Sequence, residues 1–329
     1  WSVTLFVMML EQSQAIVKST HTDQEQHSQM RLQWAACLAA LMVFSRGGHI
    51  TLFNGYFTLE LVLATFAAIH WGGRRPWCAA VALMIVSAKP TYILPLGFLM
   101  LARGNYRAIL YGAVLSVLAA ALPLGYVAYH ESLRATGEVD LQAGLQKVID
   151  DIGIAQEVHM AQEDESPVHS WTRLDLLASI CKWTGQEPGQ LAHLAVMFLM
   201  LAAPLWLLVQ RRRNDVEDGL IGGTGSLILI AGLSSLYHQS YDALLLVAPL
   251  AGLAAGQGFW ARQSTVLRVV LAGLCLIPMY SYFSTRMILL RFDSFGEIGF
   301  RLATSLNGFV IAVALALLCI QLWKSPNKY

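Results

Sequence analysis

Long apolar blocks separated by short polar breaks dominate this sequence. Many of them approach the roughly 20 residues that an α-helix needs to cross a bilayer core of about 30 Å. The runs are continuous and do not alternate with a period of two, so they favour helices over strands. We expect membrane segments at 1–17, 33–46, 50–71, 77–88, 91–102, 107–130, 190–209, 219–236, 243–257, 267–284 and 303–323.

The pair of short segments at 77–88 and 91–102 meets at Ser87-Ala88-Lys89-Pro90. A residue that precedes proline resists the helical conformation, so the chain is expected to break there. The two halves are typical of a helical hairpin or broken helix that enters the membrane and returns.

Composition agrees with a membrane protein. Of the 329 residues, 56% are hydrophobic and only 13% are charged, whereas soluble domains carry about 25% charged residues. The net charge of +1 gives no indication of nucleic-acid binding, and the five scattered cysteines form no CxxC pair that would predict a metal site or a disulfide framework. We therefore expect an all-α, polytopic transmembrane bundle of about 9–11 segments, forming one domain over residues 1–329.

Basic residues in the short loops predict the orientation, because such residues favour the cytoplasmic side. If the predicted spans alternate, the basic clusters all lie on that side: Arg74, Arg75, Arg103, Arg107, Arg211, Arg212, Arg213, Arg262, Arg268, Lys324 and Lys328. The segment 131–188 then lies outside; it holds eleven acidic and four basic residues, a net charge of −7. Within it we expect an amphipathic helix near 171–184, lying on the membrane surface.

Two polar stretches at expected outer ends of spans are candidate sites. The first contains Gly47, Gly48 and His49 and continues to Asn54 and Gly55; it suits close backbone approach or a re-entrant turn, and equally a plain interfacial turn. The second is Lys89-Pro90. An ammonium at the tip of an apolar hairpin could hold an anionic phosphate, and a lysine that merely reaches the interface is the alternative.

Two further stretches complete the set. The break Tyr237-His238-Gln239-Ser240-Tyr241-Asp242 interrupts two apolar runs with six hydrogen-bonding side chains. Histidine can bind phosphate or move a proton, and aspartate can act as a base or pair with a cation. The stretch His169–Asp175, which includes Arg173, precedes the expected amphipathic helix. The alternative for the first of these is a short polar outer loop, and for the second a purely structural interfacial helix.

Glu60 stands alone in the expected span 50–71. A carboxylate inside a membrane segment is a functional candidate by default, and Lys89 is a candidate partner.

The order of motifs from Gly48 onward resembles glycosyltransferase family 87, a group of mannosyltransferase-like membrane enzymes of the GT-C fold. The resemblance rests on LFNGYFTLELVL, then VALMIVSAKPTYILPLGFLMLARGNYR, then LSSLYHQSYDALLLVAPL, and it covers most of residues 33–257. It implies transfer of a sugar, such as mannose, from a polyprenyl-phosphate donor to a glycan or glycolipid acceptor at the outer face of the cytoplasmic membrane. No cofactor beyond this lipid-linked substrate, and no metal, is implied.

Carried over residue by residue, the resemblance makes Lys89 and His238 the contacts for the donor phosphate. It adds Asn54 and Gly55 as substrate contacts, although Tyr56 stands where the family commonly has glutamine. The wider set of expected substrate-binding residues is His49, Asn54, Gly55, Glu60, Arg173, Tyr237, Gln239 and Tyr241.

The family's general base is a carboxylate in the first outer loop, which here would precede Trp1. The base is therefore expected upstream of the sequence, with Asp242 and Asp175 as weaker candidates within it. A transporter or flippase for a lipid or small solute is the competing prediction, because broken helices and intramembrane charges occur in transporters too. A structural or assembly subunit is a third. The sequence leaves the sugar, the acceptor and the linkage open.

Overall fold

The computed structural model describes residues 33, 36–160, 166–216, 218–282, 285–292 and 296–325. Within these residues the regular structure is helical, and the one extended pairing is an isolated bridge between Arg173 and Gln239. The expected span 1–17 lies outside the described residues. The helices are α3 (Arg46–Asn54), α4 (Thr58–Trp71), α5 (Pro76–Val86), α6 (Pro90–Arg103), α7 (Tyr106–Thr136), α8 (Leu141–Met160), α9 (Leu176–Thr184), α10 (Gln190–Arg213), α11 (Gly223–Ser235), η1 (Ser240–Leu246), α12 (Val247–Ala255), η2 (Gly258–Arg262), α13 (Thr265–Tyr280), α14 (Arg286–Phe292) and α15 (Gly296–Lys324).

Three of these helices are long and apolar enough to cross a membrane: Tyr106–Arg134, Leu191–Arg213 and Gly296–Lys324. A fourth crossing is made if the bent pair Ala36–Phe44 and Arg46–Asn54 counts as one span. Shorter apolar helices of 10–17 residues make up much of the remaining body. The described part of the chain is thus an all-α protein with helices suited to a bilayer.

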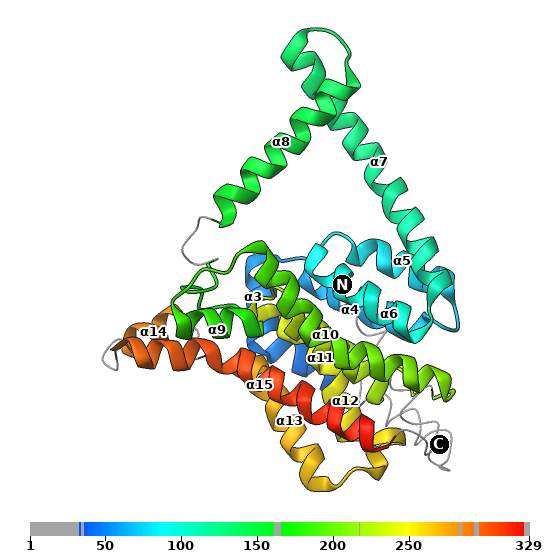
Figure 1. Ribbon diagram of the computed structural model, residues 1–329, viewed down its shortest axis with the longest axis vertical. Helices are drawn as coiled ribbons and strands as arrows, with labels where there is room; N and C mark the ends of the chain where they lie inside the picture. The colour runs from blue at the N-terminus through cyan, green and yellow to red at the C-terminus, as the bar shows by residue number, and fades with distance from the viewer. Residues whose placement is uncertain are drawn as a thin grey trace.

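The helix α11 lies at the centre of the packed body. Its side chains are buried all round, including Leu227, Ile228 and Leu229, because α6, α10, α12, α15 and η1 surround it. By contrast, α7 leaves the body and rises to an apex where it crosses α8 (Figure 1). The crossing is close: a Cβ on Gly144 would lie 1.9 Å from the carbonyl oxygen of Ala128. Apolar side chains along α7, such as Val117 and Leu122, are exposed, as lipid-facing positions would be.

The predicted break at Lys89-Pro90 is present. Helix α5 ends at Val86, Lys89 is extended (φ −124°, ψ 103°), and Pro90 starts α6. The two halves do not form a tight hairpin. Instead, α5 packs mainly on α4 and α7, whereas α6 packs mainly on α10 and α11. The break at Lys89-Pro90 therefore lies against other helices of the body and not at the tip of an isolated hairpin.

The expected boundary at Gly47-Gly48-His49 is wrong, because these residues lie inside α3. The chain bends by 71° one turn earlier, at Ser45. The Ser45 side chain accepts a hydrogen bond from Gly48 N at 3.0 Å and caps α3. Glycine is needed at position 48, since a Cβ there would lie 1.7 Å from the carbonyl oxygen of Met42. A second break, at 55–57, divides the expected span 50–71 into α3 and α4.

The expected outer segment 131–188 contains the end of α7, helix α8 and helix α9. The amphipathic helix expected near 171–184 begins later, at Leu176, because Asp175 caps it: the Asp175 carboxylate accepts from Ala178 N at 2.9 Å. Residues 171–175 are not helical and lie along the polar break that precedes η1, through the bridge of Arg173 with Gln239 and the hydrogen bond from Leu174 N to His238 O.

Candidate functional site

Lys89 sits at the N-cap of α6, where the proline after it fixes an extended backbone. Its ammonium lies 2.8 Å from both carboxylate oxygens of Asp242, which is 153 residues further along the chain. The Lys89 side chain is 20% exposed, whereas that of Asp242 is fully buried. The ion pair thus joins the two predicted polar breaks at the edge of the packed body.

Asp242 gathers hydrogen-bond donors from three directions besides Lys89. Tyr92 Oη donates to Oδ1 at 2.8 Å, His238 Nδ1 lies 3.0 Å from Oδ2, and Gln239 N donates to Oδ2 at 3.0 Å. The backbone contact arises because Gln239 and Asp242 form the capping box at the start of η1. We call Lys89, Tyr92, His238, Gln239 and Asp242 the Asp242 cluster.

The carboxylate of Asp242 is saturated by these contacts. A carboxylate offers about four lone-pair sites, and five donor contacts converge on this one. Asp242 is therefore poorly placed to accept a proton from a substrate. Its role in this geometry is to fix Lys89 and His238.

His238 presents its second ring nitrogen to a small cavity. The residue is 1% exposed, and its Nε2 has no hydrogen-bond partner within the described residues. The cavity has a volume of about 20 Å³ and is lined by Thr65, Tyr92 and Leu96 among others. That space suffices for one water molecule. With Nδ1 held by Asp242, Nε2 is the atom of His238 that can meet a ligand.

The expected fourth stretch also reaches this region. Leu174 N donates to His238 O at 2.8 Å, and Arg173 forms the isolated bridge with Gln239. The Arg173 guanidinium lies 4.8 Å from the ring centroid of Tyr237 and pairs with Asp175, with a closest distance of 2.9 Å. Segment 173–175 is therefore itself buried and packs alongside the polar break.

Asp175 is fixed in the ionised form. Burial alone would raise the pKa of its carboxyl, but Arg173 and the backbone N–H of Ala178 together hold that pKa below the ordinary value of 3.8. Both carboxylate oxygens accept from Arg173, and one also caps α9. Like Asp242, Asp175 acts here as an anchor and not as an available base.

The first expected stretch is only partly connected to the Asp242 cluster. The rings of Tyr56 and Tyr241 lie 5.0 Å apart, and the Tyr241 ring lies 5.1 Å from the Lys89 ammonium. His49, Asn54 and Gly55 are exposed. Gly55 serves the backbone, because it ends α3 with φ +67°, a conformation that favours glycine.

The expected pairing of Lys89 with Glu60 is wrong, since Asp242 is the carboxylate that Lys89 contacts. Glu60 lies in the first turn of α4 and is half-buried, so it does not lie deep within a span. The split of the expected span 50–71 at 55–57 explains this position.

The sequence did not single out Tyr92, and it marked Tyr56 only as a departure from the family pattern. A signal for Tyr92 does exist: it follows Lys89 by three residues across a helix start, so both can reach one partner. Within the described residues, no group of three or more His, Cys, Asp or Glu side chains is arranged to hold a metal ion.

Comparisons with protein-family models, with characterised proteins and with solved structures find no match to this chain. What the fold and site define is therefore a class: an all-α protein with three helices suited to crossing a membrane and a polar cluster at a helix break, centred on the buried, fully paired carboxylate of Asp242.

Proposed function

We propose that the protein is a membrane glycosyltransferase that moves a sugar, such as a hexose, from a polyprenyl-phosphate donor to an acceptor hydroxyl. In this proposal the shorter apolar helices complete a GT-C-like bundle of about 9–11 membrane segments in the cytoplasmic membrane. The site faces the outside, opposite the basic loops.

The observation that carries the proposal is the convergence of Lys89 and His238 on one carboxylate. They come from two helix breaks that are far apart in the sequence, and the resemblance to the polyprenyl-phosphate-dependent enzymes assigns the donor phosphate to these two residues. Asp242 holds both side chains in place, and preorganised donors of this kind stabilise a departing phosphate.

Lys89 retains donor capacity for a ligand. An ammonium has three N–H groups. The Lys89 ammonium makes two contacts to Asp242, which leaves one N–H group for a ligand, and the Lys89 side chain is 20% exposed. The charge of Asp242 offsets that of Lys89, so the site offers directed hydrogen bonds and only a modest net charge. This suits the monophosphate leaving group, which must be released after transfer.

The transfer is a displacement at the anomeric carbon. The acceptor oxygen forms a bond to that carbon as the bond from carbon to the phosphate oxygen breaks, and the acceptor proton passes to a general base. The phosphate leaves on the polyprenyl chain with the bonding electron pair. Lys89 donates a hydrogen bond to it, and His238 donates from Nε2 in its imidazolium form, since Nδ1–H is held by Asp242. Asp242 and Asp175 are occupied as anchors and are not assigned the role of base.

The experiment uses the full-length gene product, reconstituted with a radiolabelled polyprenyl-phosphate hexose and a crude glycolipid acceptor fraction. We expect Lys89→Gln and His238→Ala to abolish label transfer while the protein still elutes as a monodisperse species. Lys147→Gln and His193→Ala change an exposed lysine on α8 and a half-buried histidine on α10, and both variants should transfer as wild type does. Wild-type transfer by Lys89→Gln and His238→Ala would refute the assignment.

A transporter is the second candidate. The Lys89–Asp242 pair is the observation that supports it, because ion pairs beside broken helices also line transport paths. The same vesicles separate the two functions. Movement of intact donor lipid between leaflets, without cleavage of the sugar–phosphate bond, would establish transport and displace the transferase proposal.

A further inference from the structure

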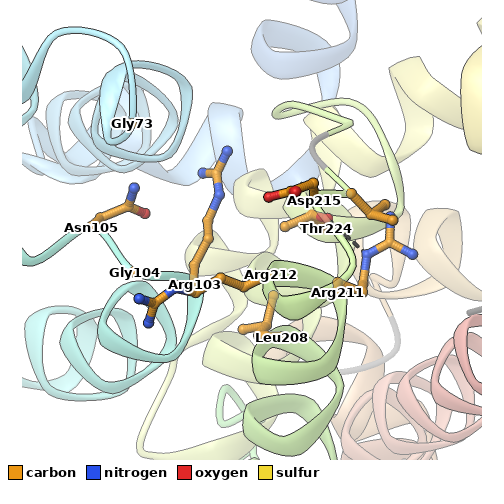
Figure 2. A pocket seen from close by; sticks show the side chains of 10 residues that line it. Gly73, Arg103, Gly104, Asn105, Leu208, Arg211, Arg212, Asp215 and Thr224 are labelled. Atoms are coloured by element: carbon orange, nitrogen blue, oxygen red, sulfur yellow. Dashed lines mark hydrogen bonds between the residues drawn. The ribbon is translucent and has the colours of Figure 1, made fainter. Parts of the chain in front are cut away.

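A second polar cavity lies at the other end of α6, between the ends of α6 and α10 and the starts of α7 and α11. Its volume is about 240 Å³, and Arg103, Gly104, Asn105, Arg211, Arg212 and Asp215 are among its lining residues (Figure 2). We call it the basic pocket. It is smaller than the roughly 300 Å³ at which sites for drug-sized ligands begin, so it suits a compact group.

Three guanidinium groups converge here from two helices. Arg211 is nearly buried and is committed to protein contacts, because it donates to Asp218 at 2.8 Å and to Thr224 at 3.0 Å. Arg103 donates to Ile69 O at 2.6 Å, and Figure 2 shows its side chain reaching across the middle of the pocket, between Asn105 and Asp215. Arg212 contacts the hydroxyl of Tyr106.

Two helix N-termini also face the pocket, and they differ. The start of α11 is capped by Asp218, whose carboxylate accepts from Gly223 N at 2.6 Å and Thr224 N at 3.0 Å. The start of α7 is not capped in this way: Asn105 occupies the N-cap position, but its side chain makes no capping hydrogen bond. A helix of 31 residues thus directs its positive end and its first N–H groups toward the arginines.

Asn105 supplies an independent indication of a ligand. The residue is 7% exposed, and its amide oxygen has no hydrogen-bond partner among the residues that the structure describes. An unpaired buried acceptor costs about 1–3 kcal/mol unless a donor reaches it. A ligand that satisfies this pocket therefore carries an anionic group for the arginines and the helix start, and a hydroxyl that donates to Asn105.

We propose that the basic pocket binds the headgroup of an anionic phospholipid that carries a free hydroxyl, of the phosphatidylglycerol type. A phosphate ester matches the fork of an arginine and the start of a helix. The lipid is favoured as the source because α7 and α10, which frame the pocket, are both long enough to cross a membrane, so their ends lie at the level of the headgroups.

Asp215 limits which anion can enter. It is exposed and lines the pocket, and its backbone is held at φ 50°. Its charge opposes a bare phosphate but can accept a hydrogen bond from a headgroup hydroxyl. The pocket therefore selects a phosphate that carries a polyol over inorganic phosphate.

The test is native mass spectrometry of the purified full chain, transferred to a neutral detergent and titrated with phosphatidylglycerol or phosphatidylcholine. We expect phosphatidylglycerol to bind at least about tenfold more tightly, since only its headgroup is both anionic and rich in hydroxyl donors. Arg212→Gln should lower its affinity about tenfold, the loss expected for one charge-assisted contact. Equal retention of the two lipids, or wild-type affinity in Arg212→Gln, would overturn the proposal.

One matched variant tests whether the effect is specific to the pocket. Arg213→Gln removes the same charge from the next residue of α10, which is exposed and does not line the pocket, so binding should persist. Equal losses in Arg213→Gln and Arg212→Gln would reduce the effect to general surface charge and would refute the site. Arg103→Gln removes a contact to Ile69 O and can disturb the fold, so Arg212→Gln is the decisive variant.

Soluble glycerol 3-phosphate distinguishes the source of the phosphate. If it competes with phosphatidylglycerol only weakly, the lipid assignment holds. If glycerol 3-phosphate binds the pocket as tightly as the lipid does, and Arg212→Gln abolishes the binding of both, the pocket is a site for a glycerol phosphate group. The assignment to a membrane lipid is then wrong.

Discussion

The Asp242 cluster and the basic pocket lie at opposite ends of α6, and they handle charge in opposite ways. At the start of α6, one buried carboxylate receives five donor contacts and the adjoining cavity holds about one water. At its end, three arginines surround an open space of about 240 Å³. The first region is organised by the protein itself, whereas the second is left for a ligand to complete.

This difference means that the most buried polar side chains need not be the ones that contact a ligand. The contacts of the Asp242 cluster hold its side chains in fixed positions. A substitution there should lower the free energy of unfolding, because removing one partner leaves the others buried and unpaired. The basic pocket tolerates single changes, because solvent can replace a lost contact at its exposed residues. Substitutions at the two ends of one helix should therefore separate stability from ligand binding.

The largest contrast is expected between two substitutions of aspartate by asparagine. Asp242→Asn should lower the free energy of unfolding by about 3–5 kcal/mol, because it leaves the Lys89 ammonium buried without its counter-charge. Asp215→Asn, at the exposed edge of the basic pocket, should change it by less than about 0.5 kcal/mol. Denaturant unfolding in mixed micelles measures both, and similar losses would show that the two regions are equally rigid.

A smaller contrast is expected between two substitutions of arginine by lysine. Arg173→Lys should cost about 2 kcal/mol, because lysine cannot reproduce the paired contacts to Asp175 in a site that is 1% exposed. Arg212→Lys keeps the charge at an exposed position and should be nearly neutral. Thermal unfolding of the two variants provides the comparison, which fails if Arg212→Lys is the more damaging.

Gly104→Ala sharpens the description of the basic pocket. Gly104 has φ +98°, and a Cβ there would lie 2.7 Å from Arg212 Nε. We expect a loss of about 1 kcal/mol from backbone strain, together with weaker phosphatidylglycerol binding as Arg212 is displaced. Gly97→Ala in the same helix faces open space and should be neutral or slightly stabilising. A neutral Gly104→Ala with unchanged lipid binding would contradict the close contact.

The last prediction concerns pH and a buried cation in α9. Burial lowers the pKa of Lys182 in α9 from 10.5 to about 8, and its ammonium donates to Thr304 O at 2.9 Å. Between these two values the unfolded chain binds a proton that the folded protein does not, so the free energy of unfolding should rise with pH over this range. Below pH 8 both states are protonated and the dependence vanishes.

The control for this prediction is Lys182→Met, which should flatten the rise between pH 8 and 10.5. An unfolding curve for the wild type that falls over this range, or one that Lys182→Met leaves unchanged, would contradict burial as the cause.

The sequence predicts those features that depend on neighbouring residues. Pro90 after Lys89 predicts the break between α5 and α6, and continuous apolar runs predict the long helices α7, α10 and α15. The bend at Ser45 was placed wrongly, because it depends on how closely Gly48 approaches the backbone of Met42, a contact that hydropathy does not record.

The long-range pairings of the candidate site could not be predicted from the sequence. Lys89 and Asp242 are each visible as a charge in an apolar setting, but their contact depends on how α6 and η1 pack around α11. For this reason the sequence offered Glu60 only as a candidate partner for Lys89, and the structure gives Asp242 instead. The basic pocket was visible only as scattered arginines that indicate orientation, since its shape depends on the ends of four helices.

The most direct test measures the functions proposed for the Asp242 cluster and the basic pocket in one experiment. Sugar transfer from a polyprenyl-phosphate hexose and retention of phosphatidylglycerol are measured on the full-length protein carrying either Lys89→Gln or Arg212→Gln. The account predicts that Lys89→Gln abolishes transfer and retains the lipid, while Arg212→Gln loses the lipid and still transfers sugar. Transfer at the wild-type rate by a folded Lys89→Gln protein would contradict its central claim.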